Sequence, residues 1–344
     1  ARSRLEVGEE PGEPAGGDAG NITLSALTIV IEDGAAVNNS TWGAGDAGAI
    51  GLTAGTVTVS GGGTGMFSRS ESWEPAGGDG GSITMNADRV SVTHGATVGT
   101  ASYGGGRGGD VTITATGPVN FSGLDDDGIA PAVFTRAEGE ETDAGDAGDI
   151  RIEGRRITLG DGGLIESASY GGGGGGDVAL VAGHADGVIT LSGTEADGSG
   201  ARIAVGAETS YARDAGRVTI ETGDLTLNDG ALIDSLTFGT GRGGDVAITA
   251  TGTVRLAGVD GDGLGSGIIA RADGADEDAG RGGDVAIEAA EIRFEDGGWI
   301  GNTSDGGGRG GDVTLTATGP IHFSGADGDG YASQVYTSAL SDEP

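Results

Sequence analysis

Hydrophobic residues recur along the whole chain in short blocks that alternate apolar and polar positions. Each block opens with Ile or Val and carries a second apolar residue two positions later. The opening residues are Ile22, Ile50, Ile83, Val111, Ile150, Val178, Val218, Val246, Val285 and Val313. The intervals between them are 28, 33, 28, 39, 28, 40, 28, 39 and 28 residues. Period-two alternation predicts strands with one buried face, and the regular spacing predicts a repeat architecture.

The short units share one internal pattern, which predicts three strands. In the first unit, Ile22/Leu24 is followed seven residues later by Ile29/Ile31, and Val37 stands alone after a further turn. A glycine precedes the third hydrophobe in every short unit: Gly34, Gly95, Gly162, Gly230 and Gly297. Because glycine adopts positive φ without steric cost, this position predicts a sharp bend.

The long units open in the same way and then diverge. Val111/Ile113 and Val119/Phe121 predict the first two strands of one of them, and an acidic glycine-rich segment, 124–128, follows. Most of the variation in unit length falls in this segment. We therefore expect the core strands to keep their register while the loops vary.

These patterns predict an all-β fold, a parallel β-helix (solenoid) of about ten coils in alternating 28-residue and 33–40-residue units. One coil cannot bury its own apolar face, whereas a stack of coils can. With strands about 4.8 Å apart, ten coils form a rod on the order of 50 Å long.

Residues 1–16 are interpreted as the tail of a preceding long unit or a linker, and residues 17–344 as a single solenoid. The absence of an initial Met indicates a processed or excised product. We expect the chain to be a window of a longer array. The alternative is that copies stack end to end as a filament.

Composition narrows the possible classes of protein. Glycine accounts for 77 of 344 residues, and 53 acidic residues against 18 basic ones give a net charge of −35. The glycines follow no collagen period, and the absence of Cys excludes disulfides and thiolate metal sites. The negative charge argues against nucleic acid as a partner, and no apolar run reaches the roughly 20 residues of a membrane span. High acidity without Lys is also typical of proteins from salty habitats.

The segments 17–37 and 145–173 resemble repeats of filamentous-haemagglutinin-like surface proteins of Gram-negative bacteria and cyanobacteria. The resemblance rests on the Gly-Asp-x-(Ile/Val) opening and the Asp-Gly turn before the third strand. It implies a right-handed parallel β-helix, export by a two-partner-type pathway, and a role in surface adhesion or extracellular matrix. It brings no catalytic residues with it.

Paired carboxylates occupy equivalent places in the long units and are each followed by glycine. They are Asp125 and Asp127, Asp260 and Asp262, and Asp327 and Asp329, with Glu195 and Asp197 as the matching pair of the remaining long unit. Because Ca²⁺ prefers six to eight oxygen ligands and a tight turn, these residues are candidate calcium ligands. The complete calcium-loop pattern is absent, so a solvated acidic loop is the alternative interpretation.

Aromatic residues occupy one repeated position of the short units. Trp42, Tyr103, Tyr170 and Phe238 each stand twenty residues after the opening hydrophobe, and Asp305 takes this place in the fifth unit. Stacked coils would align them at two-coil intervals. They are a candidate sugar-binding stripe, with packing beneath the loop of the intervening coil as the alternative.

Together these features favour a non-catalytic structural and adhesive segment of an extracellular or cell-surface fibre. Its expected partners are further copies of itself, the rest of a longer array, or surface glycans. A carbohydrate-binding module is the first alternative, and a polysaccharide-degrading β-helix is the second. In such an enzyme we would expect the acids at one place, whereas here they repeat in register.

Overall fold

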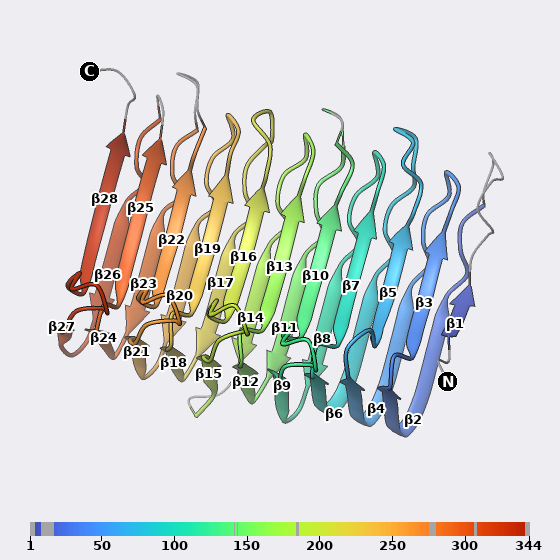
Figure 1. The fold of residues 1–344 in the computed structure, drawn as a ribbon, viewed down its shortest axis with the longest axis horizontal. Coiled ribbons are helices and arrows are strands. Elements are labelled where there is room, and N and C mark those ends of the chain that lie inside the picture. The colour runs from blue at the N-terminus through green and yellow to red at the C-terminus, as the bar shows by residue number, and fades with distance from the viewer. Residues whose placement is uncertain are drawn as a thin grey trace.

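The computed structural model describes residues 4–7, 17–140, 142, 144–183, 186–274, 280–305 and 308–340. Within these ranges every regular element is a β-strand, and every strand pairing is parallel. The strands stack in about ten coils along one axis to form a β-solenoid (Figure 1). The predicted fold class is therefore confirmed.

Two sheets run the length of the rod. Figure 1 shows the eleven-stranded sheet with each strand beside its counterpart from the next coil. This sheet consists of β1 (Arg4–Val7), β3 (Ala36–Thr41), β5 (Gly65–Ser70), β7 (Thr97–Ser102), β10 (Ala132–Ala137), β13 (Leu164–Ser169), β16 (Arg202–Ala207), β19 (Leu232–Thr237), β22 (Gly267–Ala272), β25 (Trp299–Asp305) and β28 (Gln334–Leu340).

The seventeen-stranded sheet carries the two leading strands of each coil. It consists of β2 (Ile22–Glu32), β4 (Ile50–Ser60), β6 (Ile83–Thr93), β8 (Val111–Ala115), β9 (Pro118–Ser122), β11 (Ile150–Gly154), β12 (Arg156–Leu159), β14 (Val178–Ala182), β15 (Val188–Leu191), β17 (Val218–Thr222), β18 (Asp224–Leu227), β20 (Val246–Ala250), β21 (Thr253–Leu256), β23 (Val285–Ala289), β24 (Glu291–Glu295), β26 (Val313–Ala317) and β27 (Ile321–Ser324). In the first three coils the two predicted strands are continuous, and from β8 onward a short break separates them.

The register of the sheets places like residues on like residues. Ile50 pairs with Ile83 in one sheet, and Met66 pairs with Val98 in the other. Of these four side chains, Ile50 is 1% exposed and the others are completely buried. Burying a side chain of this size contributes about 1.5–3 kcal/mol. A narrow core of Ile, Val and Leu therefore suffices, because each coil covers the next.

The interior also has a polar edge, where the chain leaves the eleven-stranded sheet. Inward Ser, Thr and Asn side chains donate hydrogen bonds to glycine carbonyls of the corner: Ser68 Oγ to Gly48 O at 2.5 Å and Ser167 Oγ to Gly148 O at 2.8 Å are examples. Buried carbonyls need such partners. The hydroxyl groups thus join the eleven-stranded sheet to the glycine-rich corner.

The glycines of this corner form a column in which successive coils approach at backbone distance. A Cβ atom at Gly216 would lie 1.9 Å from the carbonyl oxygen of Gly176. The same clash, at 1.8–2.1 Å from the preceding coil, would occur across the column Gly48, Gly81, Gly109, Gly148, Gly176, Gly216, Gly244, Gly283 and Gly311. Glycine is required here for close approach.

The predicted bend before the third strand of the short units is confirmed. Gly34 has φ 75°, and the preceding Asp33 also adopts a left-handed conformation, with φ 57°. Asp and Asn tolerate this region better than other non-glycine residues. Equivalent left-handed pairs open the other short-unit turns at His94–Gly95, Asp161–Gly162, Asp229–Gly230 and Asp296–Gly297.

Within residues 1–16 only β1 is described, and it pairs in parallel with β3, with Leu5 opposite Val37. The rest of this predicted tail lies outside the described residues. At the other end of the rod, Ile321 and Phe323 occupy core positions and are 40% and 46% exposed. No helix in the described part of the chain has the length and apolarity to cross a membrane.

Candidate functional site

The acidic loops of the long units are built around their first carboxylate. Asp260 Oδ1 accepts hydrogen bonds from the backbone N–H groups of Asp262, at 3.0 Å, and of Leu264, at 2.9 Å. The same arrangement joins Asp125 to Asp127 and Ile129, and Asp327 to Asp329 and Tyr331. The first aspartate thus holds each of these three loops closed, while the second carries an exposed side chain. In the loop 195–199 the second acid has this role instead, since Asp197 Oδ1 accepts from Ser199 N at 2.9 Å.

Each loop lies directly over the turn of the preceding short unit. A Cβ atom at Gly230 would lie 2.3 Å from Cβ of Asp260, so this glycine serves both the bend and the close approach. Loops of successive long units also contact each other, since Gly261 N donates to Gly198 O at 3.1 Å. The loops therefore form a continuous ridge along the rod.

Calcium binding by these loops stays a prediction. In the ranges that the structure describes, no group of three or more His, Cys, Asp or Glu side chains is placed to hold a metal ion. The loops fit a cation only if Oδ2 atoms, backbone carbonyls and water complete its shell, because Oδ1 of each first aspartate is already hydrogen bonded. The hydrogen bonds described above are sufficient to account for the loop shape without a metal.

The predicted aromatic residues lie at one position, immediately after the third strand of alternate coils. Trp42 is 38% exposed, Tyr170 and Phe238 are each 37% exposed, and Tyr103 is half-buried. They do not adjoin one another, because a carboxylate takes this position in every intervening coil. Glu71 N donates to Thr41 O and Tyr103 N donates to Ser70 O, which places Glu71 between Trp42 and Tyr103.

The resulting aromatic–acid stripe consists of Trp42, Glu71, Tyr103, Glu138, Tyr170, Glu208, Phe238 and Asp273. The sequence pattern identifies the aromatic members of the stripe but not its acids, because it does not locate the third strand of the long units. A signal was present: each member stands five residues after the inward hydrophobe of its third strand. Counting from Met66 gives Glu71, as counting from Val98 gives Tyr103.

The outer face of the eleven-stranded sheet adjoins the stripe and presents rings and guanidinium groups. The Arg69 guanidinium carbon lies 4.0 Å from the centre of the Phe67 ring, and that of Arg136 lies 4.4 Å from the Phe134 ring. Such cation–π contacts attract each guanidinium group to the ring face, and the Phe134 ring beneath Arg136 is only 8% exposed. Arg136 also lies 5.9 Å from the Tyr170 ring centre, so this layer is continuous with the stripe.

Burial and neighbouring carboxylates raise the pKa values of the two phenols in the stripe. Burial raises the pKa of Tyr170 to about 12, and the charge of Glu166 acts in the same direction. Burial also raises the pKa of Tyr103, with Glu138 and Glu71 adding to the shift. Both hydroxyl groups therefore remain hydrogen-bond donors near neutral pH, and that of Tyr170 donates to Glu166 Oε1 at 3.3 Å.

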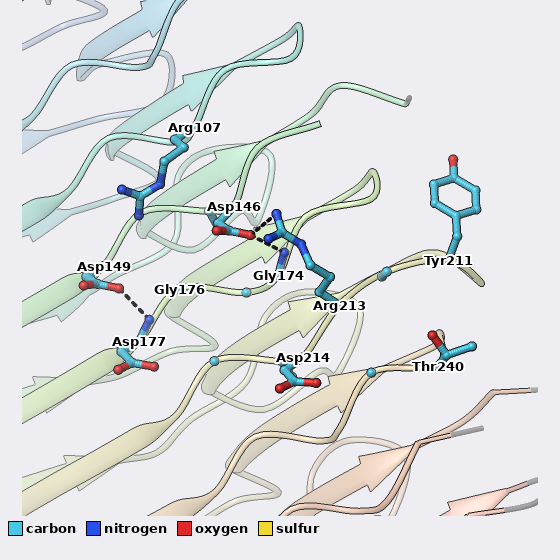
Figure 2. Close-up of a pocket in the computed structure, with 16 residues that line it drawn as sticks. Arg107, Asp146, Asp149, Gly174, Gly176, Asp177, Tyr211, Arg213, Asp214 and Thr240 are labelled. Carbon is cyan, nitrogen blue, oxygen red and sulfur yellow. Dashed lines mark hydrogen bonds and ion pairs between the residues drawn. The ribbon is translucent and has the colours of Figure 1, made fainter. Parts of the chain in front are cut away.

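A second surface runs along the glycine corner and holds a shallow hollow of about 640 Å³, drawn in Figure 2. Asp146 and Asp214 line it from two alternate coils, and Gly174 occupies the equivalent place between them. A Cβ atom at Gly174 would lie 2.8 Å from the carbonyl oxygen of Asp214, so glycine permits a close approach of the two coils here. Figure 2 shows Asp146 Oδ1 bonded to the Arg213 guanidinium, at 2.7 Å, and to Gly174 N, also at 2.7 Å.

The aspartate of the repeated Gly-Asp-x-(Ile/Val) opening bonds to the next coil. Asp149 Oδ1 accepts from Asp177 N at 2.8 Å, and Asp177 Oδ1 accepts from Arg217 N at 2.8 Å. Burial raises the pKa of Asp149, and the charges of Asp110 and Asp177 add to this shift. These acids have a structural role in joining coils, which the sequence motif alone did not reveal.

No protein-family model matches this sequence, and no curated protein matches it. Among solved structures, the chain is similar to a crystal structure of a TibC-catalysed hyper-glycosylated fragment of TibA. The identity is 14%, the match covers 89% of this chain and 100% of that chain, and the TM-score is 0.20.

Proposed function

We propose that the chain is a structural and adhesive segment of an exported bacterial fibre at the cell surface or in extracellular matrix. The observation that carries the proposal is the in-register stack of about ten coils, which holds equivalent surface residues at fixed intervals along a rod. The repeat sequence adds support through its resemblance to filamentous-haemagglutinin-like proteins. In this role the protein has no catalytic activity.

Microscopy and adhesion assays test the proposal together. We expect rods in negative-stain micrographs of the purified chain, and retention of bacteria or host cells on surfaces coated with it. Compact particles, or coated surfaces that retain no more cells than bare ones, would contradict the proposal. Sedimentation at increasing protein concentration distinguishes single rods from end-to-end filaments, because only filaments would lengthen as the concentration rises.

Carbohydrate binding is the second candidate, and the aromatic–acid stripe favours it. Exposed rings such as Trp42 and Phe238 offer the flat apolar surface against which the apolar faces of sugars pack. A glycan array tests this candidate with the whole chain. Binding to a defined set of glycans is expected, whereas an array without signal at high protein concentration would reject it.

A further inference from the structure

The alternation within the aromatic–acid stripe points to a more specific ligand than a generic sugar. Rings and carboxylates succeed each other from Trp42 to Asp273 at the same position of adjacent coils. Adjacent strands lie about 4.8 Å apart, so rings recur at about 10 Å with an acid midway between them. A ligand that follows the stripe meets an apolar surface and a negative charge in turn.

An extended β-1,4-linked glycan has a matching repeat. Successive sugar rings in such a chain turn over, so that the same ring face recurs at every second residue. That interval corresponds to the two-coil spacing of the aromatic side chains. Ring stacking on Tyr170 therefore leaves the neighbouring sugars above Glu138 and Glu208, and Phe238 receives the next stacked ring. At Tyr103 the stripe already holds a second ring, since Trp73 packs against it with ring centres 5.0 Å apart.

Charge decides which glycan of this shape fits. Glu208 and Asp273 are both half-buried, and burial raises their pKa values. Asp273 already pairs with Arg271 at 3.2 Å, and Glu138 pairs with Arg136 at 3.7 Å. A bound cation would relieve the burial of the Glu208 charge most directly and would give the paired acids a second positive partner. The whole molecule has a net charge of −35, which repels polyanions and attracts polycations. Amino groups on the sugars would satisfy both requirements.

We propose that the aromatic–acid stripe binds an extended β-1,4-linked amino-sugar polymer whose amines are free and protonated, lying parallel to the rod axis. This inference rests on the proposed adhesive function and names its ligand. The rings supply stacking, and the acids between them supply charge-assisted hydrogen bonds to the ammonium groups.

Calorimetric titration of the full chain with a hexamer of β-1,4-linked glucosamine tests the proposal. We expect measurable binding, and affinity at least about tenfold weaker, about 1.4 kcal/mol, for the fully N-acetylated hexamer and the uncharged glucose hexamer. Absence of binding to the glucosamine hexamer would overturn the proposal. Equal affinity for the uncharged hexamer, or tighter binding of polygalacturonate, would also overturn it.

Variants locate the site on the stripe. Tyr170→Ala and the double variant Glu138→Gln/Glu208→Gln should each weaken glucosamine binding about tenfold or more. The matched controls are Tyr331→Ala, an exposed ring on an acidic loop, and Glu221→Gln, an exposed acid on the other sheet. Both controls should bind like the unmodified chain. Equal losses in the controls would indicate diffuse charge attraction and reject the stripe.

Two measurements distinguish a loss of glycan binding from a loss of folding and from a loss of adhesion. The far-ultraviolet circular dichroism of each variant reports folding, and Trp42→Ala offers a second ring variant if Tyr170→Ala does not fold. The cell-retention assay reports the adhesive function. Retention without glucosamine binding would overturn the ligand alone, whereas loss of retention would contradict the adhesive function itself.

Discussion

At the scale of single residues, the tightest requirement falls on the glycine column of the corner. A Cβ atom at Gly176 would lie 2.1 Å from the carbonyl oxygen of Gly148 and 2.6 Å from its carbonyl carbon. Real side chains do not approach a backbone so closely, so a substitution must push two coils apart. The Ser167 hydroxyl would move as well, since it donates to Gly148 O and accepts from Gly176 N.

We therefore expect Gly176→Ala to lower the free energy of unfolding by about 3 kcal/mol or more. The matched control is Gly51→Ala in β4, where nothing lies within 4 Å of the added Cβ atom. It should leave stability unchanged or raise it by up to about 1 kcal/mol. Urea unfolding of both variants measures the difference, and similar midpoints would show that the corner tolerates side chains.

The sequence alone predicted where side chains repeat, and therefore most of the core. The inward Ile and Val positions followed from period-two alternation, and the turn at Gly34 followed from residue type. It did not predict hydrogen bonds between coils, such as that from Asp177 N to Asp149 Oδ1. Such bonds depend on which residues lie opposite each other one coil apart. Because long and short units differ in length, the sequence alone does not give this register.

At the scale of elements, the acidic loops are closed by side chain to backbone hydrogen bonds. Asp260 engages two N–H groups, and its own N–H donates to Leu264 O at 2.9 Å. The hydrogen bonds to Oδ1 need an acceptor oxygen but no negative charge. Charge and hydrogen bonding can therefore be separated by substitution.

We expect Asp260→Asn to unfold near the temperature of the unmodified chain, because its amide oxygen still accepts both hydrogen bonds. Asp260→Ala should cost about 1–2 kcal/mol through their loss. The control, Asp262→Ala, removes the exposed carboxylate of the same loop. Calorimetric scans with calcium and with a chelator complete the test. A calcium-dependent rise in melting temperature that Asp260→Asn abolishes would instead establish these loops as calcium sites.

The acidic loops and the third strands show which parts of the candidate site the sequence could predict. Asp260 and Asp262 were found as a pair because they are close in sequence. The alternation of Tyr170 with Glu138 and Glu208 was not found, because those acids lie in coils whose third strands follow loops of variable length. A loop insertion changes the spacing between strands, so the sequence does not give the strand register. Backbone pairing in the sheet shows that register directly.

At the scale of the whole molecule, many carboxylates lie close together on the outside of a thin rod. Burial raises the pKa values of Asp149, Glu208 and Asp273 above their ordinary range. Backbone hydrogen bonding from Ser199 lowers that of Asp197. Ionisation of Asp149, Glu208 and Asp273 therefore destabilises the fold, whereas ionisation of Asp197 stabilises it.

Stability should therefore rise as pH falls from neutral through the raised pKa values of these three groups. For a group whose folded pKa is raised, stabilisation is complete below the unfolded value, near 4, and is lost as pH rises through the folded pKa. Below about pH 4 the contribution of Asp197 is lost, so stability should fall again. Melting temperatures at constant ionic strength measure this profile, and Glu208→Gln should reduce its slope. A profile that stays flat between neutral pH and about pH 4 would contradict the expectation.

Salt should stabilise the rod by screening its own charge. Between about 0.01 M and about 1 M NaCl the Debye length falls from about 30 Å to about 3 Å, so repulsion between coils weakens. We expect the urea midpoint to rise steadily over this range, consistent with the salty-habitat hypothesis. Equal midpoints at both extremes would argue against that hypothesis and against self-repulsion as a cost to folding.

The in-register stack also determines how the molecule responds to tension. A pull on the chain ends detaches one coil at a time, because each coil is bonded mainly to its two neighbours. A short unit of 28 residues occupies about 4.8 Å of the rod and releases up to about 100 Å of extended chain. Each detached coil would thus span about twenty times its own folded length while the remaining coils stay folded. A surface fibre built this way would lengthen under a sudden load as its coils unfold, and would shorten again as they refold.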